Sequence, residues 1–358
     1  MAIEWLAGNR LRGTTAERPS ASLQSPSVGG WVELGRTTLG SSNATIDVSS
    51  IPDKRYYQIV WHTSHTGSWN QPGLRLGNGT IDTGSNYAER YNFDGGSDST
   101  NSPNTYHVQW ANAAGPNTPL FGCMYISNLS SKEKLGITHV ADQNTAGSGT
   151  APRRSETVFK WVNTSNVLDR LEFNNKGSGT FNSGSEIVVL GWDPTDTHTT
   201  NFWEELASVD LSGGSADVLS SGTISAKRYL WVQFYVKKSG SIVPEVSFND
   251  STANEYAYRF SDNGASDGTV QVNKSAFRTS TDDTNSFVNM FIINNSSTEK
   301  LAIVHSSDVT TTGAGAAPSR REIVAKWTGS SQITKIDIDN VSSGNFDTAS
   351  TMKVWGAD

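Results

Sequence analysis

The sequence is poor in cysteine, in charge and in long hydrophobic runs. Its 358 residues include a single cysteine, Cys123, so no intrachain disulfide can form and a cysteine-based zinc site does not fit. No apolar run approaches about 20 residues, and residues 1–12 lack the apolar stretch of a signal peptide. Charged residues make up 18% of the chain and the net charge is −7, which gives no basic surface for phosphate backbones. We therefore expect neither nucleic acid nor a membrane as a partner.

Glycine, serine, threonine and asparagine take the place of the missing apolar and charged residues. This mixture favours short strands and tight turns over helices. The clearest strand, residues 228–237, alternates with period two between an aliphatic face and an aromatic face. The aliphatic face is made of Leu230, Val232, Phe234 and Val236. About eight to ten such strands in ~160 residues predict an all-β, two-sheet sandwich, and we favour a jelly roll over an immunoglobulin-like or concanavalin-like sandwich.

The sequence contains an internal duplication. Motifs of the first half recur in the second half in the same order, 165 to 173 residues later. The matched pairs include Lys54-Arg-Tyr56 with Lys227-Arg-Tyr229, His139 with His305, and Ala151-Pro152 with Ala317-Pro318. We therefore predict two tandem β-sandwich (jelly-roll-like) domains of the same fold, which project in series. Repeat 1 covers residues 31–193, a polar linker covers 194–202, and repeat 2 covers 203–358.

An N-terminal arm precedes the first repeat. Residues 1–30 cannot build a core of their own, and they combine a small apolar patch around Trp5 with Arg10 and Arg12. Two interpretations stay open: a disordered tail, or a tether that becomes ordered on a neighbouring subunit or a larger surface. On the second interpretation, Trp5, Arg10 and Arg12 are candidate docking residues.

Each repeat also contains one long loop, at residues 141–155 and 306–321. Both loops are rich in small residues and end in an arginine pair, Arg153-Arg154 and Arg320-Arg321. Long loops of this kind are either flexible surface segments or contact loops that order on assembly. In the second case, the arginines would reach carboxylates of a neighbouring subunit.

The second face of the two matched strands is a candidate ligand or interface face. It carries aromatic rings with polar tips and one histidine: Tyr56, His62, Tyr229, Trp231 and Tyr235. Such rings stack on sugars or anchor protein interfaces.

Motifs for catalysis are weak. Gly264-Ala-Ser266-Asp-Gly268 matches a nucleophile pattern, but its flanks are polar where the motif needs a buried strand and a helix. His62 and His65 are three residues apart on a strand, hence on opposite faces, and we expect both at the surface. His139 and His305 each precede an aspartate by three residues, which predicts a His–Asp hydrogen bond at the base of the long loop. We assign no catalytic residue, no metal ligand and no cofactor, and we expect no enzymatic activity.

Several phrases resemble virion structural proteins of tailed phages, notably marine and cyanobacterial ones. They are WVELGRTTLG (31–40), SNYAERY (85–91), APRRSETVFKW (151–161) and SEIVVLGWD (185–193), with echoes in repeat 2, and AGNRLRGTTAER (7–18) in the arm. The resemblance implies a tandem β-sandwich on the particle surface, as a head decoration, vertex spike or fibre, assembled in the host cytoplasm. It implies other virion proteins of the capsid or tail as partners, and we expect a homo-oligomer. A carbohydrate-binding or host-receptor module, which would bind a host-surface glycan, is the competing interpretation.

Overall fold

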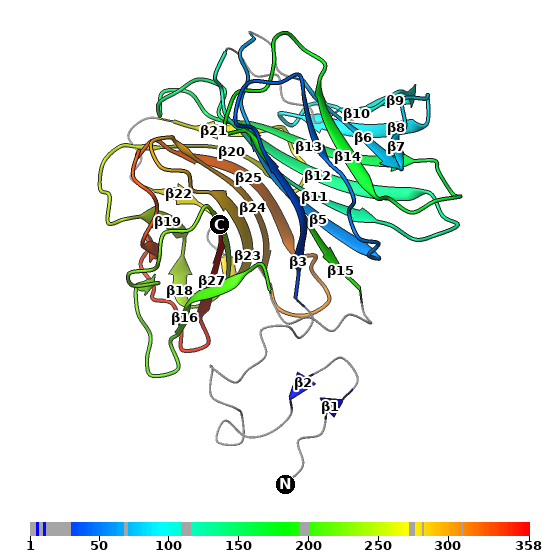
Figure 1. Ribbon diagram of the computed structural model, residues 1–358. Coiled ribbons are helices and arrows are strands. Elements are labelled where there is room, and N and C mark those ends of the chain that lie inside the picture. Colours follow the sequence, from blue (N-terminus) through cyan, green and yellow to red (C-terminus); the bar gives the residue numbers. More distant parts are fainter. Residues whose placement is uncertain are drawn as a thin grey trace.

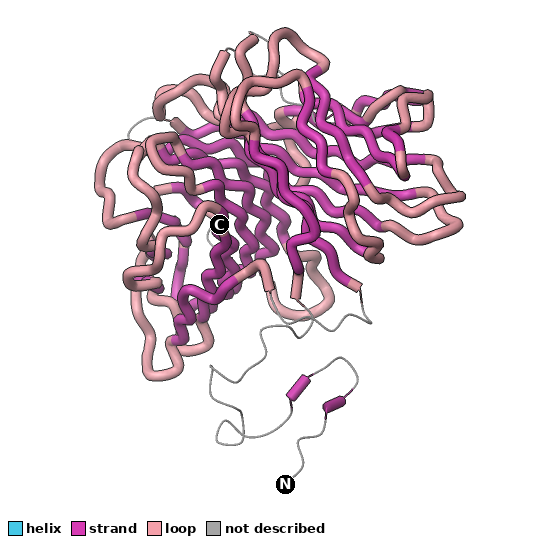
Figure 2. Tube along the Cα trace, in the orientation of Figure 1, coloured by secondary structure: helices cyan, strands magenta, loops and turns pink. Residues whose placement is uncertain are grey.

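The computed structural model describes residues 5–6, 10–11, 30–67, 71–108, 116–193, 201–271, 276–280, 283–309 and 311–358. In these ranges the chain forms strands, turns and loops, and no helix is present that could span a membrane (Figure 2). The predicted all-β class is confirmed. In the arm, β1 (Trp5–Leu6) pairs with β2 (Arg10–Leu11).

Repeat 1 is a sandwich of a large and a small antiparallel sheet (Figure 1). In spatial order, the large sheet is β3 (Val32–Thr38), β15 (Glu186–Trp192), β5 (Tyr56–Thr63), β11 (Leu120–Ser127), β12 (Lys134–Asp142), β13 (Arg153–Trp161), β8 (Tyr87–Phe93) and β9 (Ser99–Asn104). The small sheet is β10 (His107–Val108), β6 (Pro72–Asn78), β14 (Arg170–Asn175) and β4 (Thr45–Val48), and β7 (Thr80–Ile81) pairs with β6.

Repeat 2 has the same spatial order of strands, but its described residues include no counterpart of β7. Its large sheet is β16 (Glu204–Asp210), β27 (Thr351–Ala357), β18 (Tyr229–Ile242), β23 (Asp283–Ile293), β24 (Lys300–Val309), β25 (Ser319–Trp327), β20 (Tyr256–Asp262) and β21 (Gly268–Val270). Its small sheet is β17 (Val218–Ser220), β26 (Ile336–Asn340), β19 (Pro244–Phe248) and β22 (Phe277–Arg278). This identity of strand order is what a duplicated sequence predicts.

The connections between strands are those of a jelly roll. In repeat 1, β4, β5 and β6 alternate between the small and the large sheet, and β14 returns to lie between β6 and β4. In the large sheet, β3 and β15 lie on one side of β5, and β8 and β9 lie on the other side, as in a jelly roll. The β11–β12–β13 meander lies between β5 and β8. The preferred topology is therefore confirmed, with a meander where a simple jelly roll has one strand.

The period-two alternation fixes which side chains enter the core. Leu230, Val232, Phe234 and Val236 are all buried in the core of repeat 2. The matching residues of β5 that face the small sheet, including Ile59 and Trp61, are buried in the core of repeat 1. The predicted inner face of residues 228–237 is confirmed, and burial of this aliphatic and aromatic surface provides the main stabilisation of each sandwich.

The two repeats pack face to face and do not project in series. A third buried cluster joins the outer faces of the two large sheets, and Figure 1 shows these sheets next to each other. Val60, Phe121 and Leu190 of repeat 1 meet Phe291 and Ile303 of repeat 2 in this cluster. The two repeats therefore form a stack of four sheets, small–large–large–small. The expectation of an extended tandem is wrong because the outer faces of both large sheets carry apolar residues that must leave water.

Candidate functional site

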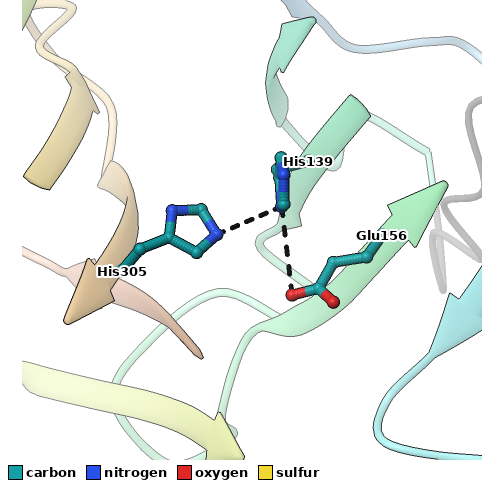
Figure 3. Close-up of side chains that lie close together, drawn as sticks. All are labelled: His139, Glu156 and His305. Carbon is teal, nitrogen blue, oxygen red and sulfur yellow. Dashed lines mark hydrogen bonds and ion pairs between the residues drawn. The ribbon is translucent and has the colours of Figure 1, made fainter. Parts of the chain in front are cut away.

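The interface between the two large sheets brings equivalent histidines of the two repeats together. His139 lies on β12 and His305 on β24, and His305 Nε2 is 3.1 Å from His139 Nδ1. On β13, an oxygen of Glu156 lies 3.9 Å from the same His139 nitrogen (Figure 3). One ligand-capable atom from each of these three side chains lies within 4.8 Å of the others. We call His139, Glu156 and His305 the interface triad.

Burial keeps both histidines of the interface triad uncharged. It lowers the pKa of His139 well below the usual value, and the neighbouring His305 and Arg154 lower this pKa further. Burial also lowers the pKa of His305. Two neutral imidazoles can share one hydrogen bond, because one nitrogen donates and the other accepts.

Arg154 borders the interface triad and ties repeat 1 to repeat 2. Its guanidinium donates to Asp267 at 2.7 Å and to Glu322 at 3.0 Å, both in repeat 2, and it also bonds Glu156. Burial by itself would lower the pKa of Arg154, but its hydrogen bonds to the carboxylates of Asp267 and Glu156 raise this pKa, so the side chain stays charged. Burial and the nearby charge of Glu156 raise the pKa of Glu322. A reciprocal ion pair at 3.1 Å connects Arg259 of repeat 2 with Asp94 of repeat 1.

The structure corrects the predicted role of two of the loop arginines. Arg154 and Arg321 are buried and bind carboxylates of their own chain, not those of a neighbouring subunit. Arg321 pairs with Asp262 at 2.9 Å and lies over the Phe260 ring. The sequence could not place these partners, because Asp267 is more than 100 residues from Arg154.

The other two loop arginines are more accessible, and their docking role stays a prediction. Arg320 is 60% exposed and pairs with Glu322 at 3.3 Å. Arg153 is half-buried, with its guanidinium 5.9 Å from the centre of the Phe93 ring.

The candidate docking residues of the arm stay predictions as well. The backbones of Trp5 and Arg10 lie in the β1–β2 pair, where Trp5 is opposite Leu11 and Arg10 is opposite Leu6. Arg12 lies outside the described residues.

The first long loop packs on repeat 2, whereas the second is exposed. The part of the first long loop that lies between β12 and β13, residues 143–152, binds the Glu299 carboxylate through the Gln143 side chain at 2.6 Å and the Gly147 backbone. The backbone of Ala151 also donates to Gln271 at 3.1 Å. Residues 311–318 of the second long loop are exposed. The first long loop therefore contacts the other repeat of its own chain, and ordering on a neighbouring subunit stays a prediction.

Three members of the candidate ligand or interface face belong to the inter-repeat interface. Tyr229 is buried and donates to Glu186 at 2.7 Å, and Trp231 packs in the aromatic cluster with Trp203. His62 contacts Asn295 of repeat 2 at 3.3 Å. Tyr235 is half-buried and lies farther along β18.

Tyr56 lies instead at an open groove on the outer face of the large sheet of repeat 1. Its ring stacks on Trp192 with the ring centres 5.7 Å apart. A pocket of about 370 Å³ is lined by these two rings, by Trp31 and Tyr125, and by Leu135 and Ile137. A second pocket of about 610 Å³ shares Leu135 and Ile137 and continues towards Val158. We call the two pockets together the repeat-1 groove.

The predicted surface position of His65 and the predicted hydrogen bond between His139 and Asp142 are both wrong. His65 is fully buried, although its spacing from His62 indicated a surface position. His139 contacts His305 and Glu156, whereas Asp142 accepts a hydrogen bond from the Asn144 backbone at 2.7 Å. The recurrence of His139 at position 305 was the one sequence signal for the interface triad, because equivalent positions can meet when two copies pack face to face.

As its polar flanks indicated, Ser266 lies exposed in the turn between β20 and β21.

Comparison with known proteins identifies no family for this chain. No protein-family model matches it, and no curated protein is similar to it in sequence.

Proposed function

We propose that this protein is a non-enzymatic structural protein of a phage virion surface, as a head decoration, vertex spike or fibre. Its role is to bind other virion proteins of the capsid or tail. The phrases that resemble virion proteins support this proposal, and so does the character of the repeat-1 groove. The first pocket of the groove is lined by aromatic and aliphatic side chains together with Ser127, which suits adhesion.

The observation that carries the proposal is a difference between equivalent faces of the two repeats. Four apolar side chains on the outer face of the repeat-1 sheet are exposed: Leu135 (58%), Ile137 (51%), Val158 (48%) and Tyr125 (37%). Their equivalents in repeat 2, which are Leu301, Ile303, Val324 and Phe291, are at most 5% exposed because repeat 1 covers them. A contiguous apolar patch of this kind on a protein surface marks an interaction site. We infer that another virion protein covers the repeat-1 face.

Incorporation of variants into particles tests this proposal. Ile137→Asp places a charge in the groove, so we expect folded protein that no longer cosediments with particles. Val218→Asp is the matched control, since Val218 is 39% exposed on the small sheet of repeat 2 and outside the groove. Incorporation of Ile137→Asp at the level of this control would contradict the role of the groove.

The arm is tested by deletion. Without residues 1–30, we expect the chain to fold, because both sandwiches and the interface between them remain. We expect this chain not to join the particle, because it lacks the docking arm. Full incorporation of this truncated chain would show that the arm is dispensable.

A glycan-binding protein is the second candidate, and the aromatic rim of the groove favours it. Trp31 and Tyr125 lie with their ring centres 6.2 Å apart beside the Tyr56–Trp192 stack, and such rings can stack on sugars. Titration with host-surface polysaccharides should then change tryptophan fluorescence, and Trp192→Ala should abolish the change. A flat titration with the wild-type chain would leave the structural role as the better explanation.

A further inference from the structure

We propose that the interface triad binds one divalent transition-metal ion, of the zinc class, which links the two repeats. His139 and Glu156 come from repeat 1 and His305 from repeat 2, so the site exists only when the two sandwiches are packed together. This inference does not depend on the proposed function.

The donor atoms fit this class of ion. Zinc prefers imidazole nitrogen and carboxylate oxygen at about 2.0–2.2 Å, in a tetrahedral arrangement that places neighbouring donors about 3.3–3.5 Å apart. The His305 Nε2 and His139 Nδ1 atoms are 3.1 Å apart, and Glu156 is 3.9 Å from His139. Small side-chain movements therefore bring all three donors to one ion. Two histidines and one glutamate leave a fourth position for water, as in catalytic zinc sites.

The surroundings leave access from solvent. A pocket of about 200 Å³ is lined by His139 and Glu156 and continues past Arg90 and Asp98, so an ion can enter from solvent. The side chains of His139 and Glu156 remain 25% and 23% exposed.

Arg154 is the competitor that the ion must displace from Glu156. The guanidinium now bonds Glu156 together with Asp267 and Glu322. When Glu156 turns to the metal, Arg154 keeps its two partners in repeat 2, and so no buried charge is left unpaired. We therefore expect a moderate affinity of the chain for the metal ion, because metal binding breaks the hydrogen bond between Arg154 and Glu156.

The experiment uses the full chain after treatment with a chelator and titrates Zn²⁺ by calorimetry and Co²⁺ by visible absorption. We expect one ion per chain, a rise in Tm, and the strong ligand-field bands of four- or five-coordinate cobalt, which Zn²⁺ removes. His305→Gln should weaken Zn²⁺ binding about tenfold or more, as should His139→Gln. His62→Gln is the matched control at the same interface and should leave the affinity unchanged within about twofold.

Three outcomes would overturn the proposal. They are no saturable binding at one ion per chain, only the weak spectrum of six-coordinate cobalt, or the same affinity in His305→Gln as in the wild-type chain. The cobalt spectrum needs no substitution, so the proposal remains testable even if a histidine variant does not fold.

Discussion

Replacement of Arg154 should destabilise the protein far more than replacement of its sequence equivalent, Arg320. The Arg154 side chain is 6% exposed and contacts Asp267, which is 1% exposed. Arg154→Met removes the positive charge and leaves this carboxylate buried. Loss of one partner of a buried ion pair costs about 3–5 kcal/mol. We expect the lower end, about 3 kcal/mol, because Arg259 remains 3.8 Å from Asp267.

Arg320→Met is the control for this prediction. Arg320 occupies the same position in repeat 2, but it is 60% exposed and its pair with Glu322 at 3.3 Å reaches solvent. Such a surface pair contributes about 0–1 kcal/mol. Arg154 and Arg320 thus separate the effect of burial from the effect of sequence position.

Urea unfolding of the full chain, followed by tryptophan fluorescence, measures the free energies of unfolding. A double-mutant cycle of Arg154→Met with Asp267→Asn isolates the interaction between the two side chains, and we expect a coupling energy of about 2 kcal/mol. If Arg154→Met and Arg320→Met lose similar stability, or if the cycle closes near zero, the assigned role of Arg154 between the repeats is refuted.

Three further substitutions test other parts of the structure. Burial lowers the pKa of His65 to about 4 from an unfolded value near 6.5, so the unfolded chain binds the proton more tightly. The free energy of unfolding should therefore fall by up to about 3 kcal/mol as the pH drops from 7 to 4. His65→Gln should flatten this part of the curve of Tm against pH, and an unchanged slope would contradict the assignment. Glu299→Ala removes the anchor of the first long loop, so limited trypsin digestion should cut at the end of that loop faster than in the wild-type chain, and equal rates would show that the anchor does not hold the loop. Gly122→Ala would place its Cβ 1.9 Å from the buried Trp61 ring and should cost about 3 kcal/mol by urea unfolding, whereas a neutral effect would mean that the ring can move.

Local pattern was sufficient to predict the fold. The alternation along residues 228–237 identified the inner face of β18, because successive side chains of a strand point to opposite sides of a sheet. The ordered recurrence of motifs predicted two copies, and the strand orders of the two halves are identical.

Tertiary structure alone decided how the two copies meet. The pattern that placed Tyr229 and Trp231 on an outer face could not say that repeat 1 covers that face. Nor could it bring together Arg154 and Asp267, or His139 and His305, whose separations in the chain exceed 100 residues. The alternation of side chains along a strand depends on neighbouring residues, so it can be recognised in the sequence. The docking of two sheets depends on the summed shape and charge of whole surfaces. For that reason the sequence by itself determined the sandwiches, and only the packed structure determined the interface triad and the open repeat-1 groove.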